Sequence, residues 1–93
     1  MYLILEEYLD DDRRIKTYVD VTADFTSSGQ LMPRHIILEN GVKYTIDKVT
    51  EIRRAASTRA GGCGIRYTCS ICGRQCYLFY EENYRWFVEM KAG

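Results

Sequence analysis

Four cysteines fall within fourteen residues, and their spacing is typical of a metal-binding motif. Cys69 and Cys72 form a CxxC pair followed at once by glycine, as in one half of a zinc ribbon. Two thiolates held in this way converge on one ion, and glycine permits the tight turn. A structural zinc site needs four ligands. Cys63 and Cys76 would complete the set, or one of them together with His35, so the cysteines predict a zinc-stabilised module as one hypothesis.

The strand pattern around these cysteines favours an alternative without metal. Residues three apart on a strand point to opposite faces, which separates Cys69 from Cys72, and the chain has no second CxxC pair. Cys69 and Cys76 then become small buried apolar groups, while Cys63 and Cys72 lie in a loop or turn. If Cys69 and Cys76 lie opposite each other they could also form a disulfide, which a reducing compartment disfavours.

Thiol catalysis also needs an activating base, and the chain has one histidine. His35 falls on a hairpin position that is expected to face the core, where a hydrogen-bonded structural histidine is the commoner case. Separated pairs of carboxylates for acid–base chemistry are not evident either. The sequence therefore predicts no catalytic residues and no enzyme activity.

A second candidate surface combines positive charge with aromatic rings. Small barrels bind single-stranded nucleic acid in this way, because rings stack on bases while arginines follow the phosphates. Exposed aromatic patches also mark contacts between proteins, so an N-terminal strand or a second copy of the chain is the competing occupant. The predicted binding residues are Arg53, Arg54, Arg59, Arg66, Tyr77, Phe79 and Phe87.

The charge distribution leaves the same two alternatives open. Thirteen basic and thirteen acidic side chains cancel, but residues 1–41 hold four basic and eight acidic groups, a net of −4. Residues 42–93 hold nine basic and five acidic groups, a net of +4. The basic half can attract phosphate, or it can pair with the acidic half within the fold.

The elements that must position these residues are strands. Apolar and polar residues alternate from position 16 to position 25, which predicts a strand with one buried face. Asn40-Gly41 predicts a type I′ turn between strands at 35–39 and 42–46, pairing Ile37 with Tyr44. After this hairpin, the spacing of Val49 and Ile52 predicts a bent, bulged strand.

The last third of the chain reads as a meander of strands at 65–72, 75–80 and 85–90. Successive side chains then point to opposite faces. One face is expected to carry Tyr67, Cys69 and Ile71 together with Cys76, Leu78 and Tyr80.

These elements predict a single all-β domain over residues 1–93, a small barrel or two-sheet roll of about six antiparallel strands with little or no helix. Its expected parts are an N-terminal strand and turn (1–14), a long strand with the Asn-Gly hairpin and the bulged strand (15–56), a glycine-rich loop (57–64) and the meander (65–90). The chain shows no export signal and no apolar run long enough to cross a membrane, which favours the cytoplasm.

The sequence also resembles a group of short, uncharacterised bacterial proteins that occur as stand-alone small domains. The resemblance covers residues 17–90, implies a small β-rich domain and supplies no known activity. It rests on Pro33, Ile36, Asn40-Gly41, Tyr44, Ile46-Asp47 and Val49, then on Gly61-Gly62, Gly64, Arg66-Tyr67-Thr68 and Trp86-Phe87-Val88-Glu89.

Three functions follow as expectations. The first is a non-enzymatic interaction module that binds a protein partner or a second copy of itself through the aromatic sheet face. The second is a small barrel that binds single-stranded nucleic acid through the arginine and aromatic residues named above. The third is the zinc-stabilised module; the first two need no cofactor.

Overall fold

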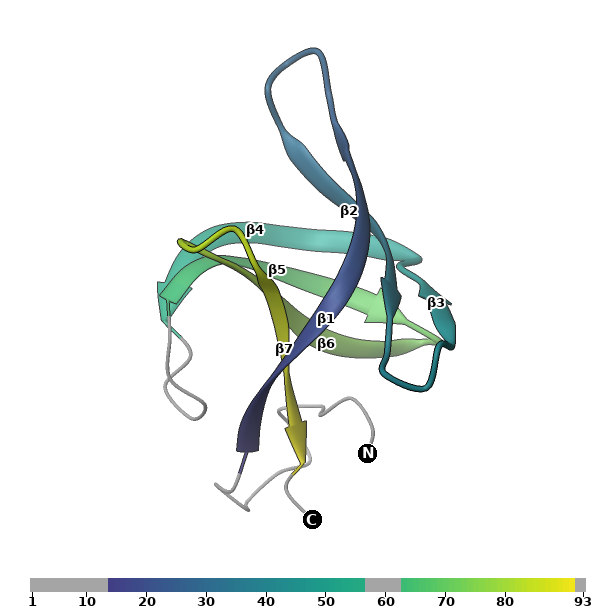
Figure 1. Cartoon of the computed structure of the whole chain (residues 1–93). Coiled ribbons are helices and arrows are strands. Elements are labelled where there is room, and N and C mark those ends of the chain that lie inside the picture. Colours follow the sequence, from purple (N-terminus) through teal and green to yellow (C-terminus); the bar gives the residue numbers. More distant parts are fainter. Residues whose placement is uncertain (1–13, 57–62, 92–93) are drawn as a thin grey trace.

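The computed structural model describes residues 14–56 and 63–91, and these residues form one curled antiparallel sheet with the shape of half a barrel (Figure 1). Seven strands lie in the order β3-β2-β1-β7-β6-β5-β4. No helix occurs in the described residues, so the predicted all-β fold class is confirmed. The strands are β1 (Arg14–Phe25), β2 (Leu31–Ile37), β3 (Lys43–Thr45), β4 (Lys48–Ala56), β5 (Cys63–Ile71), β6 (Arg74–Glu81) and β7 (Trp86–Lys91).

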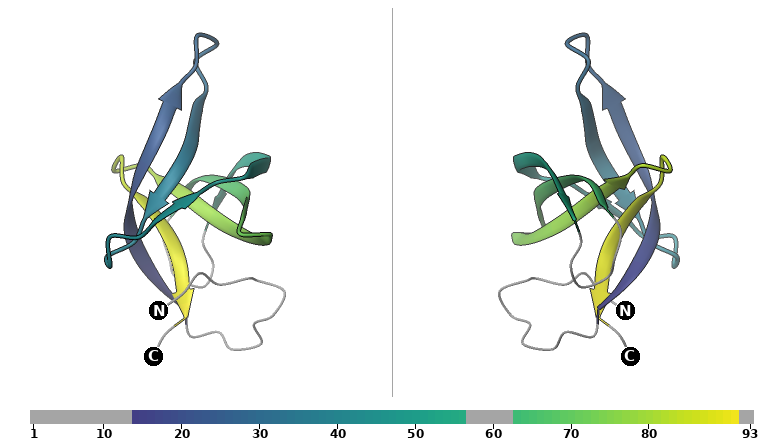
Figure 2. Two further views of the ribbon diagram at one scale, coloured as in Figure 1. Left: turned by 90° about the vertical axis from the view of Figure 1, so that its right-hand side faces the viewer. Right: turned by 90° about the vertical axis from the view of Figure 1, so that its left-hand side faces the viewer.

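The two edge strands of the sheet, β3 and β4, follow each other in the chain and meet at one corner. Between them, the Asp47 N–H donates to the Ser70 carbonyl oxygen at 2.8 Å, and the Cys72 N–H donates to Asp47 Oδ2 at 3.1 Å. These bonds tie the link between the edge strands to the end of β5. The sheet is therefore curled back on itself at this corner (Figure 2).

The hydrophobic core lies on the inner face of the curl. The Tyr67 hydroxyl crosses this interior and donates to the Leu31 carbonyl oxygen at 2.6 Å, which links β5 to β2. Cys69 pairs with Cys76 and Tyr67 with Leu78, so the predicted facing of the meander is confirmed. The buried core residues are Ile36, Ile46, Tyr67, Cys69, Ile71, Cys76, Leu78 and Val88.

The predicted register of the Asn-Gly hairpin is wrong by one residue, because Tyr44 pairs with Ile36 and not with Ile37. A type I′ turn needs positive φ at both central residues. Only Gly41 has it (φ 81°), and the Leu38 N–H donates to the Val42 carbonyl oxygen across a three-residue loop. This is the geometry of a type I turn followed by a glycine bulge. The shift turns Ile36, rather than His35, into the core.

The bulge predicted after the hairpin is confirmed, since the β4–β5 register shifts between Val49 and Glu51. The predicted glycine-rich loop, residues 57–64, is shorter than expected at its C-terminal end, because β5 begins at Cys63. Ala55 pairs with Gly64 and Ala56 with Cys63, so these residues belong to strands. A Cβ atom at Gly64 would overlap the carbonyl oxygen of Tyr80, which explains a glycine there. Residues 57–62 and the predicted N-terminal strand and turn, as far as residue 13, lie outside the described residues.

The strand β1 has two halves with different partners. Its first half, Arg14–Val19, pairs with β7, and its second half, Asp20–Phe25, pairs with β2. The second half, the turn and Leu31–Arg34 of β2 extend from the body of the sheet as a two-stranded arm (Figures 1 and 2). The β2 side of this arm still contacts the body, because Pro33 is fully buried and Met32 packs against the core. The buried face predicted for β1 is therefore wrong in the arm: Ala23 is exposed, and the side chain of Phe25 is 77% exposed.

Candidate functional site

The candidate site begins at an open strand edge, the edge of β1 that faces away from β2 along Asp20–Phe25. β7 begins at Trp86, opposite Val19, so no described strand continues the β7 side of the sheet along Asp20–Phe25. Unpaired N–H and C=O groups on such an edge can pair with another extended chain. The open edge therefore starts where β7 starts and runs out along the arm.

A notch of about 600 Å³ lies at the start of this edge. Both faces of the sheet contribute to it. Val19, Val21 and Trp86 belong to the inner face, where they pack against the core, and Tyr18 lies on the outer face, opposite Phe87. The remaining walls come from the β6–β7 turn and from β1, so that the full lining is Tyr18, Val19, Asp20, Val21, Tyr84, Arg85 and Trp86.

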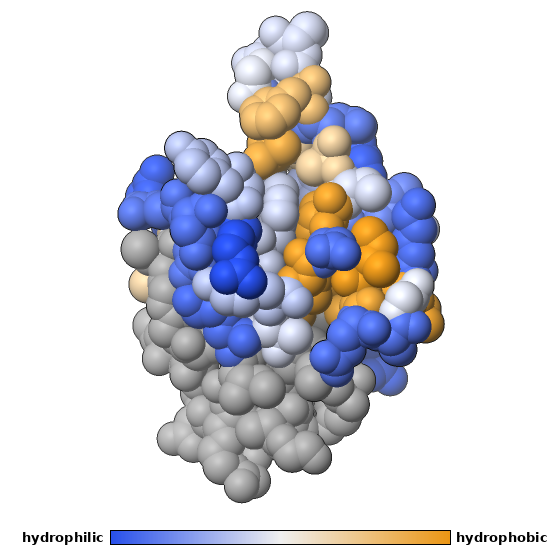
Figure 3. Space-filling model, in the orientation of Figure 1, coloured by the Kyte–Doolittle hydropathy of each residue, from blue (hydrophilic) through white to orange (hydrophobic). Residues whose placement is uncertain are grey.

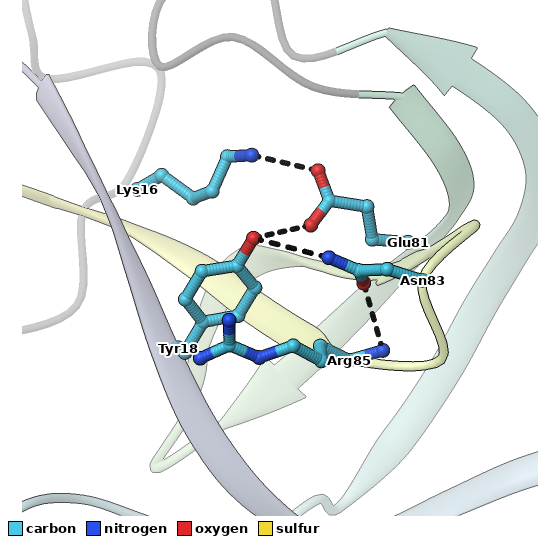
Figure 4. Close-up of polar contacts among 5 residues, drawn as sticks. All are labelled: Lys16, Tyr18, Glu81, Asn83 and Arg85. Atoms are coloured by element: carbon cyan, nitrogen blue, oxygen red, sulfur yellow. Dashed lines mark hydrogen bonds and ion pairs between the residues drawn. The ribbon is translucent and has the colours of Figure 1, made fainter.

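A polar network holds the wall of the notch in place (Figure 4). The Tyr18 hydroxyl donates to Glu81 Oε1 at 2.5 Å, and Lys16 Nζ donates to Glu81 Oε2 at 2.6 Å. The guanidinium of Arg85 lies 3.4 Å from the centre of the Tyr18 ring, in a cation–π contact. The side chains come from β1, from the end of β6 and from the following turn, so the network ties β1 to the β6–β7 hairpin.

The network also changes the proton affinity of its charged members. The hydrogen bond from Lys16, and then that from Tyr18, lowers the pKa of the Glu81 carboxyl below its ordinary value. The bond to Glu81 raises the pKa of Lys16. Both side chains are largely buried, with 12% of Glu81 and 24% of Lys16 exposed, so the pair is shielded from screening by salt. The Lys16–Glu81 pair that holds the Tyr18 hydroxyl is thus charged at neutral pH.

Tyr84 stands beside the notch in a strained backbone conformation. Its φ is 67°, in the left-handed region that favours glycine, and its side chain is 82% exposed. The two other turns with the same i to i+3 bond place Gly29 and Gly41 at this position. Such strain is concentrated at functional sites in many proteins, which makes Tyr84 a candidate contact residue.

The two faces of the arm differ in polarity. Val21, Ala23 and Phe25 alternate along one face of β1, and the apolar surface continues from the arm onto the body of the sheet (Figure 3). The other face carries acidic side chains, of which Asp24 accepts from Arg34 Nε at 2.7 Å. Thr22 Oγ1 on that face lies 2.7 Å from His35 Nδ1. The open edge therefore separates an apolar face from an acidic one.

The other open edges of the sheet carry features that discourage strand pairing. The edge strand β4 exposes Lys48, Arg53 and Arg54, and the edge strand β3 is three residues long. The outer edge of β2 contains Pro33 within the arm, and proline has no N–H to donate. The segment Asp20–Phe25 contains no lysine and no proline. Its charged side chains are Asp20 and Asp24, so lysine and proline, two common protections of a strand edge, are absent from it.

The structure brings together part of the predicted arginine and aromatic surface. Arg66 pairs with Arg53 on one side and with Phe79 on the other, and its guanidinium lies 4.3 Å from the centre of the Tyr77 ring. Phe79 and Phe87 stack on each other at 4.7 Å between centroids, and they are 2% and 0% exposed. The two phenylalanine rings are therefore covered in this structure.

The remaining arginines of that prediction are distributed differently. Arg66 Nη2 lies 3.3 Å from Glu51 Oε1, and Arg54 Nη1 lies 3.5 Å from Glu82 Oε1. Arg54 pairs with Ile65, so it does not share the face of Arg53 and Arg66. Arg59 lies outside the described residues. Arg53 and Arg66 thus remain as the cationic pair of the outer face.

The cysteines are separated by the β5–β6 hairpin. Cys69 and Cys76 face each other in the core, where burial raises the pKa of each thiol to about 12. Cys72 is exposed and forms the turn with Gly73, one residue before the predicted turn. Cys69, Cys72 and Cys76 are all free thiols, and the side chain of Cys63 lies outside the description. Among the described residues, no group of three or more metal-ligating side chains converges.

Sequence reasoning missed the residues of the notch, above all Tyr18, Tyr84 and Arg85. One signal was available, because the alternating strand at 16–25 is longer than the strand at 85–90. When a strand at 16–25 pairs with a strand at 85–90, the residues of the longer strand that have no partner must extend beyond the end of the shorter one. The length mismatch therefore pointed to an open edge.

No family model matches the sequence, and no curated protein and no solved structure matches the chain. The resemblance to short bacterial proteins accordingly stays a prediction. Within the described ranges, none of the chain forms a helix of the length and apolar character needed to cross a bilayer.

Proposed function

We propose that this chain is a non-enzymatic interaction module that binds an extended polypeptide segment as an added strand on β1. The observation that carries the proposal is the open edge of Asp20–Phe25 beside the notch. In strand addition, main-chain hydrogen bonds supply affinity and pockets for alternate side chains supply specificity. The open edge offers the main-chain hydrogen bonds, and the notch offers a pocket for side chains.

The position of the edge defines how a bound segment would run. It would lie antiparallel to β1, in line with β7 and immediately beyond Trp86. Side chains on its inner face would meet Val21 and Trp86, and those on its outer face would meet Arg85 and the Tyr18 ring. Preferred segments therefore alternate apolar residues with polar ones and carry an acidic group close to Arg85.

The chemistry of the described nucleophiles supports a module without catalysis. The thiols of Cys69 and Cys76 have pKa values raised to about 12, which keeps them protonated at neutral pH. The histidine ring of His35 contacts Thr22 in the arm and not a cysteine. Neither arrangement activates a nucleophile.

Binding of single-stranded nucleic acid receives less support. Bases would have to stack on rings of the outer face, but Phe79 and Phe87 are buried and stacked on each other. Arg53 still offers charge for phosphate on that face, whereas Arg66 is ion-paired with Glu51. An oligonucleotide titration therefore belongs in the test of the proposal.

The test is selection of extended peptides from a random display library, followed by titration of the best peptide into isotope-labelled protein. The expected result is binding that shifts the backbone amide signals of residues 18–25 and 84–86. Ala23→Lys should weaken binding by at least about tenfold, because lysine on a strand edge opposes pairing. Ala23 is exposed, so this variant keeps the fold.

Val42→Lys is the matched control, since Val42 is an exposed apolar residue on a different hairpin. It should bind the peptide as the wild type does. Peptide-induced shifts confined to other strands, or equal affinity for Ala23→Lys, would overturn the proposal. So would oligothymidylate binding at low salt that outcompetes the peptide and maps to Arg53 and Arg66.

A further inference from the structure

We infer that the open edge of β1 pairs with the same edge of a second copy of the chain, about a two-fold axis at Ala23. The inference rests on the proposed strand addition and specifies its partner. Homodimers commonly close by two-fold symmetry, in which one surface meets itself. An antiparallel edge satisfies this condition, because two copies of one strand can pair about a perpendicular axis.

The parity of β1 restricts the position of the axis. Directly opposite residues in an antiparallel pair share a face of the sheet. An axis that passes between two residues would place residues that point to different faces directly opposite each other, which the pleat of an antiparallel pair does not allow. An axis through a residue keeps like faces together, which leaves Thr22, Ala23 and Asp24 as central positions.

Charge and space then select among these three positions. An axis at Thr22 would place Asp20 directly opposite the partner's Asp24. It would also place Phe25 opposite the partner's Val19, a position that Trp86 already occupies as the pairing residue of Val19. An axis at Asp24 opposes the two Asp24 carboxylates. Like charges directly opposite each other destabilise a strand pair. The axis at Ala23 opposes Val21 to the partner's Phe25 and Thr22 to the partner's Asp24.

The selected register also explains an exposed aromatic ring. Phe25 is 77% exposed at the end of the arm. In the dimer Phe25 lies opposite the partner's Val21. The partner's Trp86 pairs with Val19, two residues away from Val21 along β1. Val21 and Trp86 both line the notch. Each copy would therefore place Phe25 against the notch of the other and cover two apolar surfaces at once.

The acidic face does not oppose this pairing. Asp24 accepts a hydrogen bond from Arg34 Nε within its own arm at 2.7 Å. In the register with the axis at Ala23, the residue directly opposite Asp24 is the partner's Thr22, which is uncharged. No pair of carboxylates lies directly opposite.

The register can be tested by a symmetric disulfide. Opposite residues of an antiparallel pair have Cα atoms about 4.5–5.5 Å apart, within the range that a disulfide spans. Ala23→Cys in a Cys72→Ser background should therefore form a covalent dimer under mild oxidation. The Cys72→Ser chain alone measures the crosslinking due to the other thiols, since Cys72 is the exposed cysteine of the described residues.

Thr22→Cys in the same background is the matched control, because the axis at Ala23 places the partner's Asp24 opposite it. It should crosslink no more than the background. Efficient crosslinking through Thr22→Cys, or none through Ala23→Cys, would overturn the register.

A second measurement does not depend on oxidation. Sedimentation of the unmodified chain over a wide concentration range should show a monomer–dimer equilibrium, and Phe25→Lys should raise the dimer dissociation constant by at least about tenfold. Val42→Lys should leave it unchanged. A chain that stays monomeric while library peptides still bind at residues 18–25 would overturn the second-copy inference and leave the proposed function standing. A monomer that also binds no peptide would overturn both.

Discussion

The body of the sheet and the arm are built from the same strands but are stabilised in different ways. In the body, Leu78 and Val88 are 0% and 1% exposed, and each central strand has a neighbour on both sides. In the arm, two strands pair only with each other, and Phe25 is 77% exposed. Two-stranded hairpins are marginally stable in water without further packing. Pro33 and Met32 pack the arm against the body, but no described strand lies beside Asp20–Phe25 on the side away from β2, so a third strand can be added there and not in the body.

The largest expected difference between the two regions is the effect of removing an apolar side chain. Leu78→Ala should lower the free energy of unfolding by about 3 kcal/mol, because it leaves a cavity in the core of the body. Phe25→Ala should change it by less than about 0.5 kcal/mol in the monomer, since the ring is exposed. Urea unfolding measures both.

A similar loss for the two variants would mean that the arm packs as tightly as the body. Measurement at low protein concentration keeps any dimer out of the comparison. At high concentration, the second-copy inference predicts that Phe25→Ala becomes the more harmful of the two for assembly.

An intermediate effect is expected at the junction of arm and body, where Glu81 holds Lys16 and Tyr18. Glu81→Gln should cost about 1–2 kcal/mol at neutral pH, because it weakens two hydrogen bonds to a charged group. The pKa of Glu81 is lowered in the folded state. The stability that this carboxylate contributes is therefore present above the ordinary value of 4.5 and is lost as the pH falls through the lowered pKa.

Urea unfolding from about pH 7 to about pH 2 should consequently bring the wild type and Glu81→Gln together at the acid end. At the alkaline end, the raised pKa of Lys16 predicts that its contribution persists above the ordinary value of 10.5 and is lost as the pH rises through the raised pKa. A constant difference between the two proteins from neutral to acid pH would contradict a role for the charged form.

The smallest expected effect concerns the turn beside the notch. Tyr84 adopts the left-handed conformation that Gly29 adopts in the turn of the arm. Tyr84→Gly should raise the free energy of unfolding by about 0.5–1 kcal/mol, because glycine relieves the backbone strain. Peptide binding should weaken at the same time if Tyr84 contacts the bound segment. Improved stability with unchanged affinity would remove Tyr84 from the site and leave the strain without a functional reason.

Much of the fold was predictable because it depends on local alternation. The shared face of Cys69 and Cys76 and the bulge after Val49 both follow from the period of two along the chain. Their direct pairing did not follow, because the turn lies at Cys72-Gly73, one residue before the predicted position. The hairpin register at Asn40-Gly41 did not follow, since the same dipeptide fits a two-residue and a three-residue loop. Only the observed φ of the two residues distinguishes these loops.

The candidate site was less predictable than the fold because it depends on where strands stop. Alternation from position 16 to position 25 indicates a buried face, but it contains no information about the end of the neighbouring strand. Phe25 lies in the arm, beyond the point where β7 starts opposite Val19, and is exposed. The outer aromatic face shows the reverse case, since Phe79 and Phe87 were expected at a binding surface and are buried.

The continuity of β1 has a mechanical consequence. The strand passes without a break from its six residue pairs with β7 into its pairs with β2. A force applied along the arm is therefore borne in shear by all six pairs with β7 together. A force applied across the arm would instead separate its two strands pair by pair, starting at the tip. A ligand that pulls along the axis of β1 would thus meet far greater resistance than one that pulls perpendicular to it.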